Sequence, residues 1–208
     1  MRFDVLYEQF AQRLLLEQAG YTALYPGGYK PPHRGHYELA KAYATDPAID
    51  KVVILMGPTA RGTVTCEQSE EIWNDYYIGT IDGNVELQRV GNPYTAAYEY
   101  VDNAVAGQNF CFVASMKAEE DAARSQKFAD DHAPGSKYHK PGINVVHHPK
   151  DAVAIYEGRN DDENGKPVSA SQMREDIKNH DMDNFKTNLP LEVEGYADNI
   201  LRLLTSCI

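Results

Sequence analysis

Apolar residues follow two alternating patterns along this chain. Continuous apolar runs of about four to six residues are typical of buried strands, and apolar residues three or four positions apart are typical of helices. The predicted strands are 21–25, 51–56, 85–90, 110–114 and 143–146. The predicted helices are 4–19, 36–44, 65–77, 93–105 and 119–130, then a helix that starts near Ser171 and a helical tail from 181.

This alternation predicts an α/β fold. Strands that are separated by helices form parallel sheets with right-handed crossover connections. We expect one α/β domain over residues 1–180, with the helix 4–19 at its N-terminus, and a helical C-terminal extension over 181–208. The first helix is expected to end at Gly20, and Pro93 suits the first turn of a later helix.

Composition narrows the classes of partner. The chain has 208 residues, a net charge of −11 and a pI near 5.0. Nucleic-acid binding depends on clustered Lys and Arg, so the acidic balance favours a small-molecule substrate over DNA or RNA. The longest apolar run, 52–56, is far too short to cross a membrane. Three cysteines without paired spacing fit a reducing compartment, and we expect a cytoplasmic protein that could form a homo-oligomer.

The segment from Gly27 to His36 combines groups that suit phosphate binding. It reads Gly27-Gly28-Tyr29-Lys30-Pro31-Pro32-His33-Arg34-Gly35-His36 and follows the first predicted strand. Glycines let the backbone approach a ligand closely, and the prolines stiffen the approach to the histidines. The next helix would turn its positive N-terminal end to the same ligand. A bound anion favours the imidazolium form, which donates from both nitrogens, so we predict an anion site here.

Two patterns in this chain resemble the signatures of one family. Gly-x-(Phe/Tyr)-x-Pro-x-His-x-Gly-His at 27–36 is similar to the first signature of the nucleotidylyltransferase superfamily of α/β phosphodiesterases. The run 168–174, Val-Ser-Ala-Ser-Gln-Met-Arg, fits its second signature, an apolar residue followed by Ser-x-(Ser/Thr)-x-x-Arg. Members move a nucleoside monophosphate from a nucleoside triphosphate onto a phosphate-type acceptor and release pyrophosphate. The resemblance implies that activity and a Rossmann-like, doubly wound parallel sheet.

The resemblance also implies a choice of nucleotide. A proline at position 31, two residues before His33, resembles the signature of the adenylyltransferase branch. That branch includes enzymes that build dinucleotide cofactors from nicotinamide mononucleotide, so the resemblance favours ATP over CTP. Lys30 departs from both branches, where an acidic or amide residue is more common. The stretch 63–69 before Trp73, with the 14 tyrosines, resembles cytidylyltransferase-like proteins of bacteriophages. A cytidylyltransferase that uses CTP is therefore the alternative.

The predicted roles follow from the signatures. Catalytic residues are His33, His36, Arg174 and Lys30; nucleotide-binding residues are Gly27, Gly28, Tyr29, Gly35, Ser169 and Ser171. Arg61 and Lys117 follow predicted strands and are candidate acceptor-binding residues. Mg²⁺ is expected with the triphosphate, since it typically binds through substrate phosphates. No dedicated protein metal site is expected.

Simpler interpretations remain open for each motif. The His-x-Gly-His run alone is also compatible with a surface turn or part of a metal site. The serines of the second signature could be helix caps only, Arg61 and Lys117 could be solvated loop residues, and the pair 147–148 is typical of a strand end. A nucleotide sensor without turnover is a further alternative. A nucleotide hydrolase is disfavoured, because no water-activating carboxylate lies near either signature.

Overall fold

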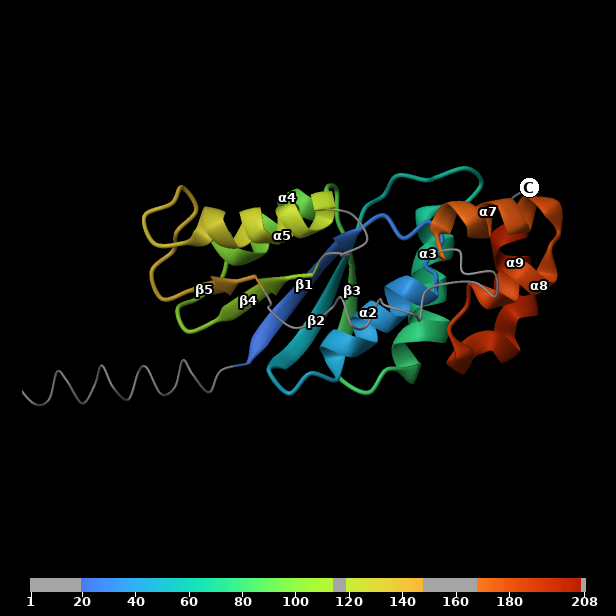
Figure 1. Ribbon diagram of the computed structural model, residues 1–208, viewed down its shortest axis with the longest axis horizontal. Coiled ribbons are helices and arrows are strands. Elements are labelled where there is room, and N and C mark those ends of the chain that lie inside the picture. Colours follow the sequence, from blue (N-terminus) through green and yellow to red (C-terminus); the bar gives the residue numbers. More distant parts are fainter. Residues whose placement is uncertain (1–19, 114–118, 148–167, 207–208) are drawn as a thin grey trace, which may run out of the picture.

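The computed structural model describes residues 20–113, 119–147 and 168–206. Within these ranges a five-stranded sheet, in which all neighbouring strands run parallel, forms the centre (Figure 1). The strands are β1 (Tyr21–Gly27), β2 (Ile49–Met56), β3 (Val85–Arg89), β4 (Asn109–Phe112) and β5 (Asn144–Val146). The α-helices are α2 (Arg34–Ala44), α3 (Cys66–Glu71), α4 (Pro93–Asp102), α5 (Glu119–His132), α7 (Ala170–Asn179), α8 (Met182–Thr187) and α9 (Ala197–Thr205). The predicted helix 4–19 lies outside the described residues.

The strand order β3-β2-β1-β4-β5 places β1 at the centre of the sheet. The chain builds outward from β1 through β2 to β3, then returns past β1 to add β4 and β5. In sheets of this kind, ligands bind at the carboxyl ends of the strands where the direction of winding changes, which here lies between β1 and β4. The predicted doubly wound α/β fold is confirmed. The segment 27–36 begins at that edge, because it leaves the end of β1.

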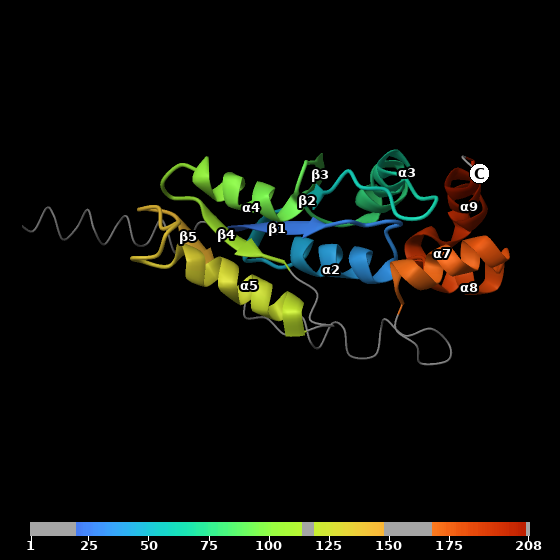
Figure 2. The same cartoon turned by 90° about the horizontal axis from the view of Figure 1, so that it is seen from above.

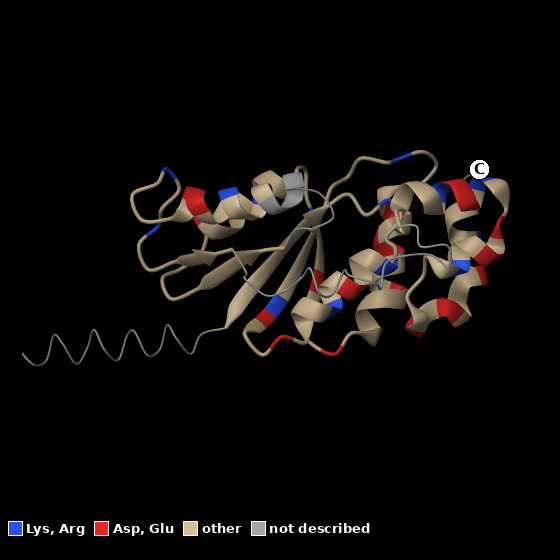
Figure 3. Ribbon diagram, in the orientation of Figure 1, with Lys and Arg blue, Asp and Glu red and all other residues tan. Residues whose placement is uncertain are grey.

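Alternate residues of the central strands face opposite helical layers. Tyr25 and Ile54 belong to a hydrophobic cluster that includes α2, α3 and the C-terminal helices, and Leu24 and Val53 to a second cluster under α4 and α5. Figure 1 shows α4 and α5 on one side of the sheet and α2 on the other. Charged residues lie mainly on helices and loops (Figure 3), since a sheet covered on both faces needs apolar strands.

The predicted helix 65–77 is only partly α-helical. Thr65 caps it, because its hydroxyl accepts from the Gln68 amide and the Gln68 side chain accepts from the Thr65 amide. After α3, residues Ile72–Tyr77 form a π-helix, and Ile78–Thr80 form a short 3₁₀ turn. A π turn bonds each residue to the fifth one on, so it brings Ile72 and Tyr77, both fully buried, onto one face.

The C-terminal helices gather at the end of the sheet toward which the strands point (Figure 2). His180 follows the last residue of α7 and caps it in the left-handed conformation with φ 55°. Beyond it, Phe185, Leu189 and Ile200 join the same hydrophobic cluster as β1 and α2. The 3₁₀ segment Leu191–Tyr196 links α8 to α9. The tail is therefore packed into the core that it shares with the α/β domain. None of the helices in the described ranges has the length and apolarity needed to cross a bilayer.

Candidate active site

The two histidines of the first signature cap helix α2 with their side chains. His33 is the N-cap residue, and its Nδ1 accepts a hydrogen bond from the Gly35 amide at 3.1 Å. In return, the His33 amide donates to Nδ1 of His36 at 3.2 Å. This is a capping box in which imidazoles replace the usual Ser or Thr and Glu. The two rings lie face to face, with centroids 3.7 Å apart and planes tilted by 31°.

These hydrogen bonds decide the form of both rings. A backbone amide can only donate, so Nδ1 of His33 and of His36 must be unprotonated. This hydrogen-bond pattern assigns the ring proton of each histidine to Nε2. Local capping thus uses Nδ1 of each ring, whereas the imidazolium form expected with a bound anion would donate from both nitrogens.

The N-terminus of α2 is also less open than predicted. The Arg34 amide donates to the Asn188 carbonyl at 2.7 Å, and the Gly35 amide is bound by His33. Asn188 follows α8, so a carbonyl from the tail reaches the first turn of α2. The described donors at this end of α2 are thus satisfied within the protein, and the side chains of His33 and His36 are better placed than the backbone to bind an anion.

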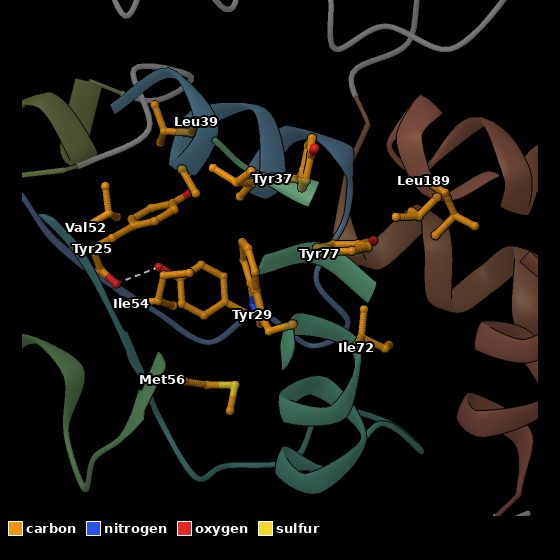
Figure 4. Close-up of a cluster of buried hydrophobic side chains, with 14 of the residues drawn as sticks. Tyr25, Tyr29, Tyr37, Leu39, Val52, Ile54, Met56, Ile72, Tyr77 and Leu189 are labelled. Carbon is orange, nitrogen blue, oxygen red and sulfur yellow. Dashed lines mark hydrogen bonds between the residues drawn. The ribbon is translucent and has the colours of Figure 1, made fainter. Parts of the chain in front are cut away.

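Tyr29 turns its ring into the core (Figure 4). Its backbone is in the left-handed region with φ 51°, a conformation that costs a bulky residue about 1–3 kcal/mol. Burial offsets this, because only 3% of Tyr29 is exposed and its ring packs edge-on against Tyr25, His36 and Trp73. Its hydroxyl donates to the Tyr25 carbonyl at 2.7 Å. The Tyr29 side chain, which was predicted to bind nucleotide, therefore packs against the ring of His36. Its burial leaves the Tyr29 backbone as the part that could contact a ligand.

The two glycines before Tyr29 have different surroundings. A Cβ on Gly27 would lie 2.6 Å from Cζ of Tyr29, so glycine is required for the inward turn of that ring. A Cβ on Gly28 would meet nothing within 4 Å, and Gly28 is exposed. Gly28 therefore lies exposed at the carboxyl edge of the sheet, with its carbonyl bound by Lys30; its role in nucleotide binding stays a prediction.

Lys30 lies inside the protein. It is 1% exposed, and its Nζ donates to the carbonyls of Gly28 at 2.7 Å and Gly57 at 2.9 Å. Burial lowers the pKa of the ammonium, while Cys66 and Glu67 act in the opposite direction. Gly57 directly follows β2, so Lys30 ties the ends of β1 and β2 together. The sequence predicted a catalytic role for Lys30, but its ammonium is directed at backbone oxygens.

Arg174 brings the second signature to the first. Its Nη1 donates to the Lys30 carbonyl at 2.5 Å, and its Nη2 donates to Oγ of Ser171 at 3.0 Å. Ser169 is the N-cap of α7, and its hydroxyl accepts from the Gln172 amide. Of the two predicted nucleotide-binding serines, one caps the helix and the other orients Arg174. The guanidinium is thus fixed against backbone three residues before His33.

Arg61 lies beside Arg174, in the loop that follows β2. A Cβ on Gly62 would be 3.4 Å from Cδ of Arg174, so the two chain segments are in contact. Burial, and after it the charge of Arg61, lowers the pKa of Arg174. Across the described part of the chain, the Arg61 side chain forms no ion pair or hydrogen bond. Lys117, the other candidate acceptor residue, lies outside the described residues.

The second histidine pair is only half described. His147 follows β5, and its Nδ1 is 3.0 Å from Oγ of Ser125 on α5. Ser125 also donates to the Phe112 carbonyl, so this contact joins α5 to the ends of β4 and β5. His148 is outside the described residues. Among the residues described, no group of three or more His, Cys, Asp or Glu side chains could hold a metal ion.

The fold and the site together define a doubly wound α/β protein in which Arg174 contacts the backbone of the segment that leads from β1 to the stacked rings of His33 and His36. No protein-family model and no curated protein sequence matches the chain. Among solved structures, it is similar to "Plasmodium falciparum nicotinic acid mononucleotide adenylyltransferase complexed with APC". The identity is 12% and the TM-score 0.47, over 88% of this chain and 98% of that chain.

Proposed function

We propose that this protein is a nucleotidylyltransferase, which transfers a nucleoside monophosphate from a nucleoside triphosphate to a small phosphorylated acceptor. The observation that carries the proposal is the hydrogen bond from Arg174 to the Lys30 carbonyl, between residues 144 positions apart. It joins the second signature to the segment that carries His33 and His36, whose rings stack on each other. A parallel sheet of this type binds its ligands at that edge.

The reaction needs positioning and charge stabilisation. An acceptor oxygen attacks the α-phosphorus and forms a new P–O bond. The bond from the α-phosphorus to the bridging oxygen breaks, and pyrophosphate leaves with the electron pair. No protein nucleophile takes part, so the residues act by donating hydrogen bonds to phosphate oxygens as charge shifts. His33 and His36 would donate through Nε2, and Arg174 through the N–H groups that Lys30 and Ser171 do not use.

Two adjacent guanidinium groups suit a reaction between two anions. The triphosphate and a phosphorylated acceptor repel each other, and their reacting oxygens must nevertheless come within bonding distance. We propose that Arg174 and Arg61 together bind the phosphates of both substrates, and that Arg61 lies on the acceptor side of the pair. Their like charges, held close together in the absence of ligand, would be neutralised when both substrates bind.

The choice of nucleotide and metal rests on the sequence. Pro31 favours AMP transfer from ATP, and CMP transfer from CTP is the alternative. Mg²⁺ would accompany the triphosphate and neutralise part of its charge, which fits a site whose own groups are imidazoles and guanidiniums. A cytoplasmic location and a small-molecule acceptor, with no nucleic acid or membrane partner, complete the proposal. A relationship to bacteriophage proteins stays a prediction.

Pyrophosphate release tests the proposal. The protein is incubated with each of the four common nucleoside triphosphates, Mg²⁺ and a panel of phosphorylated acceptors that includes nicotinamide mononucleotide. We expect release with ATP and one class of acceptor, and its loss in Arg174→Lys. Nucleotide binding by calorimetry without release for any pair would favour the sensor alternative. If the protein neither binds a nucleotide nor releases pyrophosphate, the proposal is wrong.

A further inference from the structure

We propose that Lys30 is a positioning residue that holds the Arg61 loop against Arg174 through the carbonyl of Gly57. The two guanidiniums then form one preorganised anion-binding pair. This inference rests on the proposed function for its biological meaning, but the pair itself can be tested with an inorganic anion. It replaces the catalytic role that the sequence predicted for Lys30.

Lys30 makes contacts in two directions. Its carbonyl accepts a hydrogen bond from Arg174, and the Nζ of Lys30 donates to the Gly57 carbonyl at 2.9 Å. Gly57 begins the loop that carries Arg61, and Gly62 of this loop contacts Arg174. Lys30 therefore contacts the guanidinium of Arg174 and also Gly57, at the base of the loop that carries Arg61.

Several contacts fix the position of Gly57, at the base of the loop that carries Arg61. Its amide donates to the Gly27 carbonyl at 3.1 Å, which extends the β1–β2 ladder by one bond. A Cβ there would be 3.1 Å from Cγ of Pro93, at the start of α4. The Cys66 thiol also donates to its carbonyl, at 3.6 Å. Lys30 thus contributes the charged member of a set of contacts that leaves Gly57 little freedom.

The far end of the loop is anchored as well. Arg61 and Val64 exchange backbone hydrogen bonds at 3.0 and 3.2 Å around Gly62, whose φ of 61° suits glycine. Val64 is fully buried, and Thr65 caps α3. The loop between these anchors is exposed, and the repulsion between the two guanidiniums would push it away from α7. A rigid base at Gly57 opposes that movement.

The buried ammonium suits this role better than a role in catalysis. An ammonium with 1% exposure is unfavourable unless its protons are bound, and two of the three are bound by carbonyls. The titratable groups near it are Cys66 and Glu67 of α3 and Arg89 of β3. A charge held inward in this way cannot also bind a phosphate, but it can keep the segments that do bind phosphate in place.

A double-mutant cycle with inorganic tripolyphosphate tests the inference. Its affinity is measured by calorimetry for the full chain, Lys30→Met, Arg61→Ala and the double variant. Lys51→Met is the matched control, because Lys51 lies near the start of β2 and pairs with Glu86. Loss of one charge-assisted hydrogen bond weakens binding by about tenfold or more. We expect about tenfold from each single change and about tenfold again, not a hundredfold, from the double variant.

Each outcome decides the question. An additive loss of about a hundredfold in the double variant would show that Lys30 does not act through Arg61, and the inference would fail while the proposed function stands. No tripolyphosphate binding by the unmodified protein would overturn both. If Lys30→Met does not fold, Lys30→Gln, whose amide can still donate to one carbonyl, is used in the same cycle and should show the same lack of additivity.

Discussion

Arg174→Lys offers a direct test of the geometry of the site. In the structure the guanidinium uses one N–H on the Lys30 carbonyl and one on Oγ of Ser171, and it keeps three more for a ligand. A lysine has a single nitrogen, which cannot hold both anchors and reach a phosphate. The substitution keeps the charge but removes the fork, so it isolates the contribution of shape.

The size of the effect follows from the number of bonds lost. A hydrogen bond to a charged group contributes about 1.5–3 kcal/mol. Loss of one such bond in the transition state corresponds to a fall of roughly 10- to 150-fold in kcat/KM, at about 1.4 kcal/mol per tenfold. We expect a fall of about a hundredfold, mostly in kcat if the bond strengthens as charge develops on the phosphates.

The assay is steady-state pyrophosphate release, with Arg202→Lys on α9 as the control. Arg202 is exposed in the last turn of that helix, so the same chemical change there should leave kcat/KM within about twofold. Thermal unfolding of both variants excludes a general loss of fold. If Arg174→Lys retained activity within about twofold under conditions where the unmodified protein turns over, the role of the guanidinium would have to be withdrawn.

Three further predictions concern stability and the histidines. Phe185→Ala should lower the free energy of unfolding by about 3–5 kcal/mol, because Phe185 is fully buried in the shared core; loss of less than about 1 kcal/mol in a denaturant titration would mean that the tail folds separately. His36→Ala should lower kcat by about a hundredfold and the free energy of unfolding by about 1 kcal/mol, since it removes the Nε2 donor and half of the capping box. The control is His139→Ala, on an exposed loop, which should change neither quantity. The pKa of Lys30 is lowered in the folded state, so the native protein binds fewer protons than the unfolded chain between that pKa and 10.5. Stability should rise with pH across this window and rise less in Lys30→Met; identical slopes in thermal melts of the two proteins would refute the assignment.

Much of the framework could be predicted from local sequence. The five strands and the helices between them lie close to their predicted ranges, because the apolar period is set by the geometry of each element. Thr65, Asn92 and Ser169 cap helices through amides two or three residues away, so these caps are visible in the sequence. The capping box between His33 and His36 had the same three-residue spacing. The sequence does not reveal it, because imidazoles rarely fill that role.

Other features depend on segments that are distant in the chain. The fold brings Arg174 of α7 to the Lys30 carbonyl after β1. The C-terminal tail brings the Asn188 carbonyl to the first turn of α2. The π-helix at Ile72–Tyr77 depends on how these side chains pack in the core. No local pattern contains the partner in these cases, so neither the closed N-terminus of α2 nor the inward direction of Lys30 could be predicted.

The sequence by itself determined the order of strands and helices, the class of fold and the residues suited to phosphate chemistry. These depend on the apolar period and on side-chain type, and both are properties of neighbouring positions. Only the tertiary structure decided which partners those residues contact. His33 and His36 use Nδ1 to cap α2, Arg174 is held at the first signature, and Lys30 is turned inward. The reason is physical: the direction of a buried polar group is set by the partner that satisfies it, and here that partner often comes from a remote part of the chain.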